Sequence, residues 1–194
     1  MINRNKKIYQ IAVLGSNVVN KRIYKIAYEV GKEIAKSGHI LINGGLSGVM
    51  EASAKGAYEA GGIIVGILPG IDFSEGNRFS TIKVLTGMQY ARNQIVALSC
   101  HGAIVIGGSS GAYEEARRVW EGRGPVVVIK DSGSKTGAAN TLIERQRKLG
   151  IAFPEEKKKP FKIFVVSNPR EAVKKIITLI EQGYPKNKLR NKNL

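Results

Sequence analysis

The sequence predicts an α/β protein: a Rossmann-like, open, mostly parallel sheet with helices on both faces, in a single domain. Short apolar, β-branched runs alternate with amphipathic helical patterns along most of the chain, as in parallel sheets. Glycine-rich turns follow several of these runs, where a strand would pass into a helix. The 194 residues, of which 43% are hydrophobic and 24% charged, suit one compact core.

Two strand–helix units open the chain. Residues 8–15 form the first apolar run, and one face of the helical pattern after it carries Ile23, Ile26, Ala27, Val30 and Ile34. Gly38 is expected to end that helix, and residues 40–42 to form the second strand. The turn at 44–45 leads into a helix whose inner face is expected to consist of Val49, Ala52, Ser53, Gly56 and Ala57.

The middle of the chain departs from strict alternation. Residues 63–68 are typical of a third strand, which stops at Pro69-Gly70. A polar stretch over 71–80 follows, which we interpret as a candidate lid, and residues 81–85 resume the character of a strand. A helix is then expected from about residue 89 to residue 100.

The last third returns to the alternation. Strands are expected at 103–106, 126–129 and 161–166. Helices are expected from about 111 to 121, from the N-cap Asn140 through Leu149, and from Pro169 to the closing Gly183. The charged run over 155–159 is expected to be a loop.

We expect a nucleotide-binding domain over residues 8–183, flanked by a basic extension over 1–7 and a basic tail over 184–194. Lysine and arginine number 31 against 15 aspartate and glutamate, a formal net charge of +16. Such a charge attracts nucleic acid, anionic membranes or phosphorylated metabolites, and by itself does not choose among them. We assign most of it to solubility.

The residue inventory excludes several classes of protein. Cys100 is the only cysteine, so no intrachain disulfide or cysteine-pair zinc site is available, and we expect a reducing, cytoplasmic location. No apolar run approaches the length that spans a bilayer, and no membrane partner is expected. His39 and His101 lack partners at metal-binding spacing, so no metal site is predicted.

Three glycine-rich turns are expected at the carboxyl edge of the sheet, where helix N-termini attract anions. Their residues are Gly15 and Ser16; Gly44, Gly45 and Gly48; and Gly107, Gly108, Ser109, Ser110, Gly111 and Ala112. One such turn is weak evidence, because tight connections need glycine for steric reasons. Three converging turns favour a phosphate-bearing, nucleotide-type ligand. The spacings of the dinucleotide fingerprint and of the Walker loop are absent, which disfavours NAD binding and P-loop ATP hydrolysis.

Two charged residues are expected to point inward near these turns. On the helix after Gly111, Glu115 shares a face with Ala112 and Val119, whereas Glu114 lies on the wet face, four residues before Arg118. Arg92 lies on the face of Ile95 and Val96. The pattern leaves two hypotheses evenly open: a buried Arg92–Glu115 pair with no catalytic role, and a pair that takes part in acid–base or charge-stabilising chemistry.

An ordered set of short segments between residues 8 and 129 is more specific than any single turn. It comprises Gly44-Gly45, Gly48-Val-Met-Glu-Ala52, Gly61-Gly62, Gly66-Ile-Leu-Pro69, Ala91-Arg92-Asn93 and Gly107-Gly-Ser-Ser-Gly-Ala-Tyr-Glu-Glu115. This set resembles the LONELY GUY-type family, formerly labelled possible lysine decarboxylases, and within it the molybdenum-cofactor-carrier-like and DprA-related branch. The resemblance implies a Rossmann-like fold, usually a homodimer, and a nucleotide or nucleotide-containing cofactor, including the molybdenum cofactor, at the carboxyl edge.

The resemblance also implies an activity. Characterised hydrolases of the family need no cofactor to cleave the N-glycosidic bond of a nucleoside 5′-monophosphate, which releases the free base and ribose 5-phosphate. Their pattern is PGGxGTxxE with an upstream arginine–lysine pair, and Arg92 and Glu115 match its catalytic residues. The sequence departs from the pattern at the proline, second glycine, threonine and lysine positions, which are Gly107, Ser109, Ala112 and Asn93. Ala112 lacks the hydroxyl that would donate to a phosphate.

The sequence therefore predicts a protein that binds a nucleotide or nucleotide-containing cofactor at the carboxyl edge of its sheet. The first alternative is a phosphoribohydrolase of nucleoside 5′-monophosphates in which Arg92 and Glu115 are catalytic. The second is a nucleic-acid-binding protein, which the net charge and the resemblance to the DprA-related branch suggest. It is not favoured, because the sequence has no interleaved aromatic and basic pattern.

Overall fold

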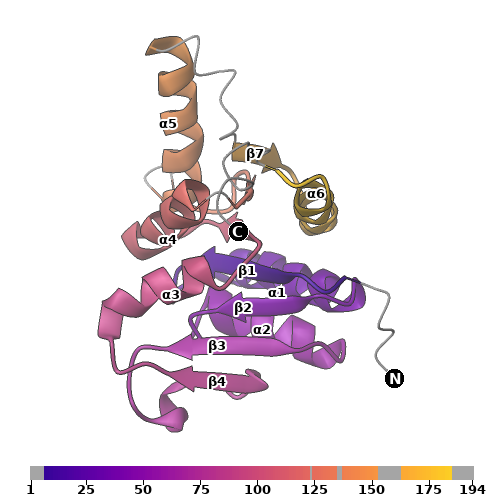
Figure 1. Cartoon of the computed structure of the whole chain (residues 1–194), viewed down its shortest axis with the longest axis vertical. Helices are drawn as coiled ribbons and strands as arrows, with labels where there is room; N and C mark the ends of the chain where they lie inside the picture. The colour runs from indigo at the N-terminus through magenta and orange to yellow at the C-terminus, as the bar shows by residue number, and fades with distance from the viewer. Residues whose placement is uncertain (1–6, 123, 135–136, 153–162, 185–194) are drawn as a thin grey trace, which may run out of the picture.

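The strands form one parallel sheet in the order β4-β3-β2-β1-β5-β6-β7 (Figure 1). The computed structural model describes residues 7–122, 124–134, 137–152 and 163–184. Within them the strands are β1 Gln10–Gly15, β2 Ile40–Asn43, β3 Ile64–Leu68, β4 Ile82–Leu85, β5 Gly102–Ile106, β6 Val126–Ile129 and β7 Ile163–Val166. The strand order reverses between β1 and β5, which makes their carboxyl ends the topological switch point.

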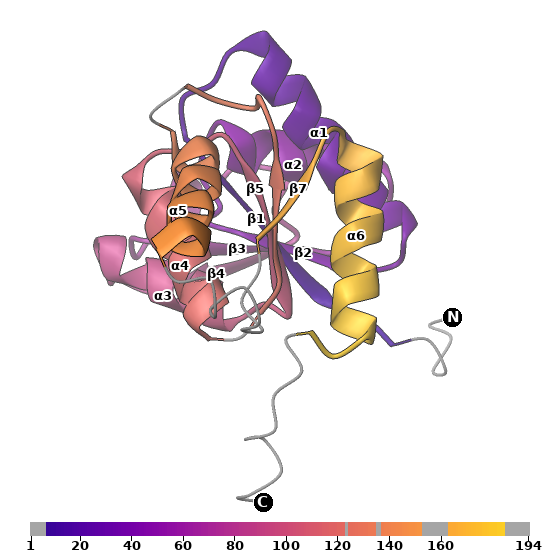
Figure 2. The same cartoon turned by 90° about the horizontal axis from the view of Figure 1, so that it is seen from above.

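Helices cover both faces of the sheet, and Figure 2 shows the two groups on opposite sides. One face carries α1 (Lys21–Lys36), α2 (Val49–Glu59) and α6 (Pro169–Glu181). The other carries α3 (Asn93–Leu98), α4 (Ser110–Glu121) and α5 (Ala138–Ala152). Two short 3-10 turns, η1 (Phe73–Glu75) and η2 (Gln89–Arg92), lie in the connections around β4. The predicted single-domain, doubly wound α/β fold is confirmed.

The core consists of two layers, because successive strand residues point to opposite faces. In β1, Ile11 and Val13 pack against the α1 side, whereas Ala12 and Leu14 pack against the α3 side. The central strands are buried on both faces, so their sequences are continuous apolar runs rather than alternating ones. The inner face predicted for α2 is buried throughout, including Ser53 and Gly56.

Local signals place the ends of several helices. The Asn20 side chain caps α1 by accepting a hydrogen bond from the Ile23 amide at 2.9 Å. Pro169 opens α6, and the side chain of Asn168 caps it. Gly38 and Gly183 have φ values of 74° and 65°, a left-handed conformation that glycine adopts without strain.

Two expectations are wrong in detail. The helix expected over 89–100 is instead the 3-10 turn η2 followed by α3, which ends at Leu98. At the start of η2, Gln89 has a φ of 49° and its amide donates to the carbonyl of Pro69. Asn140 lies inside α5, which begins two residues earlier and is capped by carbonyls of another turn. Instead of capping, the Asn140 side chain donates to the carbonyl of Ser134 at 2.9 Å.

Other expectations fall partly outside the described residues. These are the charged loop over 155–159, the start of the strand expected over 161–166, and the basic segments 1–7 and 184–194, of which Lys7 and Tyr184 are described. The polar stretch over 71–80, interpreted as a lid, contains η1, and Nζ of Lys83 in the edge strand β4 donates to its Phe73 and Gly76 carbonyls. The backbone amide of Asn77 donates to the carbonyl of Gly45 at 2.7 Å, so this stretch supports a glycine turn.

Candidate functional site

The ends of β1 and β5 meet the start of α2 at the switch point. Gly15 pairs with Ile106 in the sheet, and a Cβ at Gly15 would lie 2.7 Å from the carbonyl oxygen of Ile106 and 2.6 Å from Cγ2 of Val49. Only glycine fits this junction. Ser16 contributes its carbonyl, which accepts a hydrogen bond from the Val49 amide at 2.9 Å and caps α2. Gly48, at a φ of 67°, has no room for a side chain beside that carbonyl.

The turn at 107–108 is fixed by the loop that follows β6. Gly107 and Gly108 have φ values of 58° and 95°. The Gly107 amide donates to Oγ of Ser132 at 2.8 Å, and that buried hydroxyl donates to the carbonyl of Ile129 at 2.5 Å. The carbonyls of Gly108 and Gly107 accept hydrogen bonds from the first two amides of α5. The turn therefore leaves the first-turn amides of α4, rather than those of α5, for a ligand.

The N-terminus of α4 is the least satisfied of the three helix starts at this edge. Ser109 is its N-cap but makes no side-chain capping bond, and Ser109 and Ser110 are exposed. By contrast, α1 is capped by Asn20, and the first amide of α2 is bonded to Ser16. Free amides at a helix N-terminus, with its partial positive charge, attract anions. The sequence predicted three equivalent phosphate-binding turns. In the structure, the free amides for a phosphate are at the N-terminus of α4, and the other two turns lie around it.

The turn after β2 is held by two asparagines. Asn43 is fully buried, its Oδ1 accepts from the Gly45 amide at 2.8 Å, and its Nδ2 donates to the carbonyl of Met50 at 2.9 Å. Asn77 donates from Nδ2 to the carbonyls of Gly45 and Leu46, each at 3.0 Å. These bonds fix Gly44 and Gly45 at the carboxyl end of β2.

Arg92 and Glu115 form a buried ion pair beside these turns. Nη1 of Arg92 lies 3.2 Å from Oε1 of Glu115, and the two side chains are 9% and 10% exposed. The guanidinium packs against Gly44, where a Cβ would lie 2.3 Å from Nη1. Nε of Arg92 is buried and has no hydrogen-bond partner among the described residues. The structure thus brings Arg92 and Glu115 together, the pairing on which both hypotheses from the sequence rest, and places Gly44 against the guanidinium.

Burial controls the electrostatics of this pair. Loss of solvent raises the pKa of Glu115 to about 7, against a smaller opposing effect of Arg92. Burial also lowers the pKa of Arg92, and Glu115 opposes that shift. A carboxyl group with a pKa near neutrality can hold or release a proton under ordinary conditions, which suits a general acid or base.

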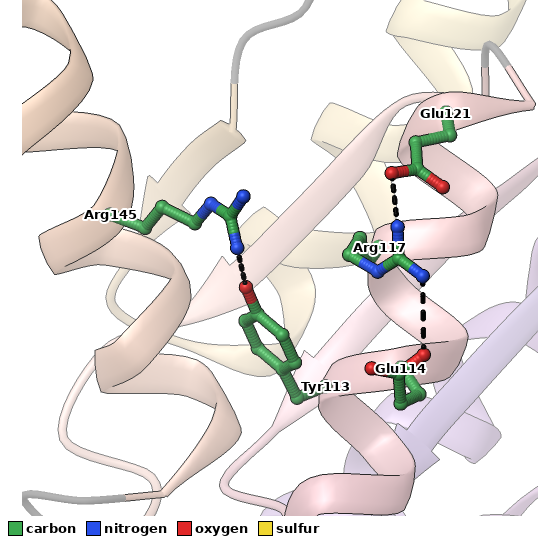
Figure 3. A network of polar contacts seen from close by, with 5 residues as sticks. All are labelled: Tyr113, Glu114, Arg117, Glu121 and Arg145. Carbon is green, nitrogen blue, oxygen red and sulfur yellow. Dashed lines mark hydrogen bonds and ion pairs between the residues drawn. The ribbon is translucent and has the colours of Figure 1, made fainter.

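Glu114, the neighbour of Glu115, lies on the solvent-facing side of α4 among charged side chains. Arg117 bridges Glu114 and Glu121 on the surface, and Arg145 of α5 donates to the hydroxyl of Tyr113 at 2.5 Å (Figure 3). Glu114 therefore lies on the wet face, as predicted, but pairs with Arg117.

The described residues contain no group of three or more His, Cys, Asp or Glu side chains that could hold a metal ion. The two histidines have structural contacts instead. Nδ1 of His39 accepts from the Tyr9 amide at 3.3 Å, and Nδ1 of His101 accepts from the Gln10 amide at 3.0 Å.

Sequence reasoning missed the side chains that hold the glycine turns, namely Asn43, Asn77 and Ser132. Asn43 had a detectable signal, since it is a polar residue that ends an apolar strand just before Gly44-Gly45. Ser132 had none, because its partner Gly107 is 25 residues away.

The remaining predicted residues line the start of α4. Among them, the Cβ of Ala112 lies 2.7 Å from where a Cβ on Gly108 would stand, and a Cβ on Gly111 would find only Asn93, at 3.6 Å.

The sequence profile of the SLOG cluster4 family matches residues 8–173. The chain belongs to this family. It is 45% identical over 130 residues to an uncharacterized protein of Archaeoglobus fulgidus, an alignment that covers 63% of this chain and 85% of that protein. The family assignment agrees with the resemblance found in the sequence, since the SLOG superfamily includes the LONELY GUY and DprA proteins.

Solved structures with a similar fold include two molybdenum cofactor proteins. The molybdenum cofactor binding protein from Rippkaea orientalis superposes with a TM-score of 0.75 at 26% identity, over 90% of this chain and 98% of that one. The molybdenum cofactor carrier protein from Chlamydomonas reinhardtii gives 0.72 at 28% identity, over 89% and 99%. DprA from Streptococcus pneumoniae, at 17% identity and a TM-score of 0.64 over 87% of this chain and 62% of that one, shares the fold.

None of the helices in the described ranges combines the length and the apolar character that crossing a membrane requires.

Proposed function

We propose that this protein binds a nucleotide or a nucleotide-containing cofactor at the carboxyl edge of its sheet, as a molybdenum-cofactor-carrier-like protein. The observation that carries the proposal is the uncapped N-terminus of α4 beside a buried arginine whose Nε has no partner among the described residues. A buried donor without a partner costs free energy that a bound acceptor would recover. The likeness to two molybdenum cofactor proteins over about nine tenths of the chain supports this choice of ligand class.

The groups present suit a phosphate. The amides of Ser110, Gly111 and Ala112 belong to the first turn of α4, and a phosphate there would receive their hydrogen bonds and the helix dipole. Gly107 and Gly108 lack side chains that would obstruct its approach. For the molybdenum cofactor, the same groups would hold its phosphate, because no cluster of metal-ligating side chains exists among the described residues. The cofactor supplies the metal chemistry, and the protein supplies the binding site.

Substitution of Ser110 by glutamate tests this proposal. Ser110 is exposed at the first position of α4, and the first turn of α4 has no acidic residue. A carboxylate there interacts favourably with the helix dipole, so Ser110→Glu is expected to keep or raise the melting temperature of the free protein. It places a negative charge where the phosphate would bind and is expected to weaken binding at least roughly tenfold.

Ser110→Gln is the matched control and is expected to bind nearly as wild type. The assay is the ligand-induced rise in melting temperature with AMP, GMP, CMP, UMP and a molybdopterin ligand, together with mass spectrometry of the small molecules that copurify. If none of these ligands shifts the melting temperature of the wild type, the proposal is wrong. Equal shifts in wild type and Ser110→Glu would place the site elsewhere.

A phosphoribohydrolase activity is the second candidate, and the buried Arg92–Glu115 pair favours it. With a pKa of about 7, Glu115 is suited to stabilise positive charge that develops on the ribose or to activate water. Against this, Ala112 and Asn93 stand where the hydrolase pattern has threonine and lysine. We therefore infer binding without efficient turnover. Release of free base and ribose 5-phosphate by the wild type at about 1 per second or faster, lost in Glu115→Gln, would reverse this inference.

Nucleic-acid binding is supported by the net charge of +16 and by the resemblance to the DprA-related branch. Such binding is expected to be weak and to fall steeply with salt. Tight binding of single-stranded DNA at physiological salt would favour it over the carrier proposal.

A further inference from the structure

An aromatic ring projects into solvent beside the candidate site. Tyr90 belongs to η2, two residues before the buried Arg92, and is 89% exposed, more than any other large apolar or aromatic side chain that the structure describes. Among the described residues, none forms a hydrogen bond or a ring contact with the Tyr90 side chain. Single exposed apolar residues are ordinary, so exposure alone does not indicate a site.

A strained backbone holds the turn that carries Tyr90. Gln89 and Asp131 are the two non-glycine residues with positive φ in the described ranges, and this conformation is much rarer for glutamine than for aspartate. The Gln89 amide donates to the carbonyl of Pro69 at 2.9 Å, which fixes η2 to the end of β3. Strain of this kind is concentrated in segments that hold ligands. Here it fixes the position of the exposed ring.

The geometry of η2 places this ring near the start of α4. The Asn93 amide donates to the carbonyl of Tyr90, a 3-10 bond that puts the two side chains on one side of the turn and roughly 6 Å apart along it. Nδ2 of Asn93 lies 3.6 Å from where a Cβ on Gly111 would stand, so this side faces the first turn of α4. Figure 1 shows α3, which follows η2, beside α4.

A nucleotide held at α4 would bring its heterocycle within reach of this ring. The phosphate would be bound by the first-turn amides of α4, which fixes one end of the ligand. The sugar and heterocycle then extend outward from the carboxyl edge, where η2 lies. Stacking on an aromatic side chain suits any planar base, because every base has a π-face, and a bicyclic ring offers more area than a pyrimidine.

We propose that Tyr90 is the platform on which the heterocycle of the bound ligand stacks, and that this heterocycle is a purine or a pterin. The inference rests on the proposed function, because it needs a phosphate at the start of α4. The two contacts would divide the recognition between them: the α4 amides bind the phosphate, and Tyr90 distinguishes a nucleotide or pterin from a plain sugar phosphate.

A comparison of two ligands tests the proposal. GMP and ribose 5-phosphate share the sugar and the phosphate, and only GMP has a heterocycle. Tyr90→Ala is expected to weaken GMP binding roughly 5- to 100-fold, the range found for loss of base–aromatic stacking, and to leave the affinity for ribose 5-phosphate unchanged. Tyr90→Phe is expected to bind GMP nearly as wild type, because stacking does not need the hydroxyl. Both dissociation constants are measured by titration calorimetry.

Two control variants show whether the effect is local. Tyr58→Ala removes a ring that is 54% exposed at the end of α2 remote from the glycine turns, and it is expected to bind both ligands as wild type. Val18→Ala removes an apolar side chain that is 83% exposed in the connection after β1. It is also expected to have no effect, whereas a loss of GMP affinity there with none in Tyr90→Ala would place the heterocycle on the wrong side for the proposal.

A spectroscopic signal tests stacking directly. Tyr90→Trp is expected to keep GMP binding and to lose tryptophan fluorescence on addition of GMP but not of ribose 5-phosphate, with wild type, which has only Trp120, as the background. The proposal is overturned if Tyr90→Ala binds GMP as wild type, if it loses both ligands equally, or if Tyr90→Trp shows no quenching by bound GMP. A wild type that binds neither nucleotides nor ribose 5-phosphate would instead overturn the proposed phosphate site, and the role of Tyr90 with it.

Discussion

Substitution of Gly44 by alanine tests whether Arg92 must lie where the structure places it. The Cβ of an alanine would stand 2.3 Å from Nη1, 2.5 Å from Nη2 and 2.6 Å from Cζ of Arg92, whereas ordinary contact begins at 3.4 Å. The guanidinium must therefore retreat by about 1 Å or turn away. Its hydrogen bond to Glu115, already 3.2 Å long, would then be lost. The positive charge itself stays in the protein.

The expected loss follows from that displacement. The displaced guanidinium would also no longer reach a ligand bound at the site; a hydrogen bond to a charged group contributes about 1.5–3 kcal/mol, so loss of that protein–ligand bond is expected to lower ligand affinity roughly 10- to 100-fold. Titration calorimetry with the nucleotide that gives the largest thermal shift would measure it. Gly61→Ala is the control for general destabilisation, because its φ of 74° strains an alanine while no atom lies within 4 Å. It is expected to lower the melting temperature and leave affinity unchanged.

A double-mutant cycle decides whether Gly44 acts through Arg92. If it does, Gly44→Ala has no further effect in the Arg92→Ala background. The reasoning is refuted if Gly44→Ala binds as wild type, or if its loss of affinity adds in full to that of Arg92→Ala. Additivity would mean that Gly44 leaves room for the ligand itself and that the guanidinium is secondary.

Two further predictions concern the groups around this pair. The pKa of Glu115 is about 7 in the folded protein against an ordinary 4.5, so the folded state holds this proton more tightly than the unfolded chain. This raised pKa contributes fully to the free energy of unfolding below pH 4.5, and the contribution is lost as the pH rises through 7. Glu115→Gln is therefore expected to flatten the pH dependence of the free energy of unfolding, measured with denaturant, over that window. If the variant kept the same slope of stability against pH, the pKa shift would be contradicted. Ser132→Ala removes the acceptor of the Gly107 amide and is expected to cost about 1–3 kcal/mol in the same assay and to weaken ligand binding, with partial recovery in Ser132→Thr. Loss of stability with unaltered affinity would show that ligand binding does not depend on the turn that Ser132 holds.

The fold could be predicted because its signals are local. Apart from the edge strands β4 and β7, each strand is a mostly apolar run of four to six residues buried by helices, and every strand begins and ends within about two residues of the predicted range where the structure describes it. Pro169 and Gly183 mark the ends of α6 by their own backbone preferences. Such features need no knowledge of distant contacts.

The errors occur where distant contacts decide the structure. The chain at Gln89 enters a 3-10 turn with a left-handed φ of 49° and its amide bonded to Pro69, and α5 begins before Asn140 because two glycine carbonyls from the β5–α4 turn cap it. Nothing in the residues near 89 or 140 shows these bonds. The same limit applies to the site: helical spacing predicts that Arg92 and Glu115 point inward, but not that Ser132 fixes the turn beside them.

The Arg92–Glu115 pair also bears on why the site has this composition. A buried ion pair recovers its desolvation cost only when further hydrogen bonds satisfy both groups, and apolar replacements of similar volume are often as stable or more so. Here one hydrogen bond joins the pair, Nε of Arg92 has no partner among the described residues, and burial holds the pKa of Glu115 far above its ordinary value. Stability therefore does not explain the pair. The sequence left a structural role and a functional role for the pair equally open, and this geometry favours the functional one. An anion bound between the guanidinium and the α4 amides would satisfy the donors that the protein itself leaves unmatched.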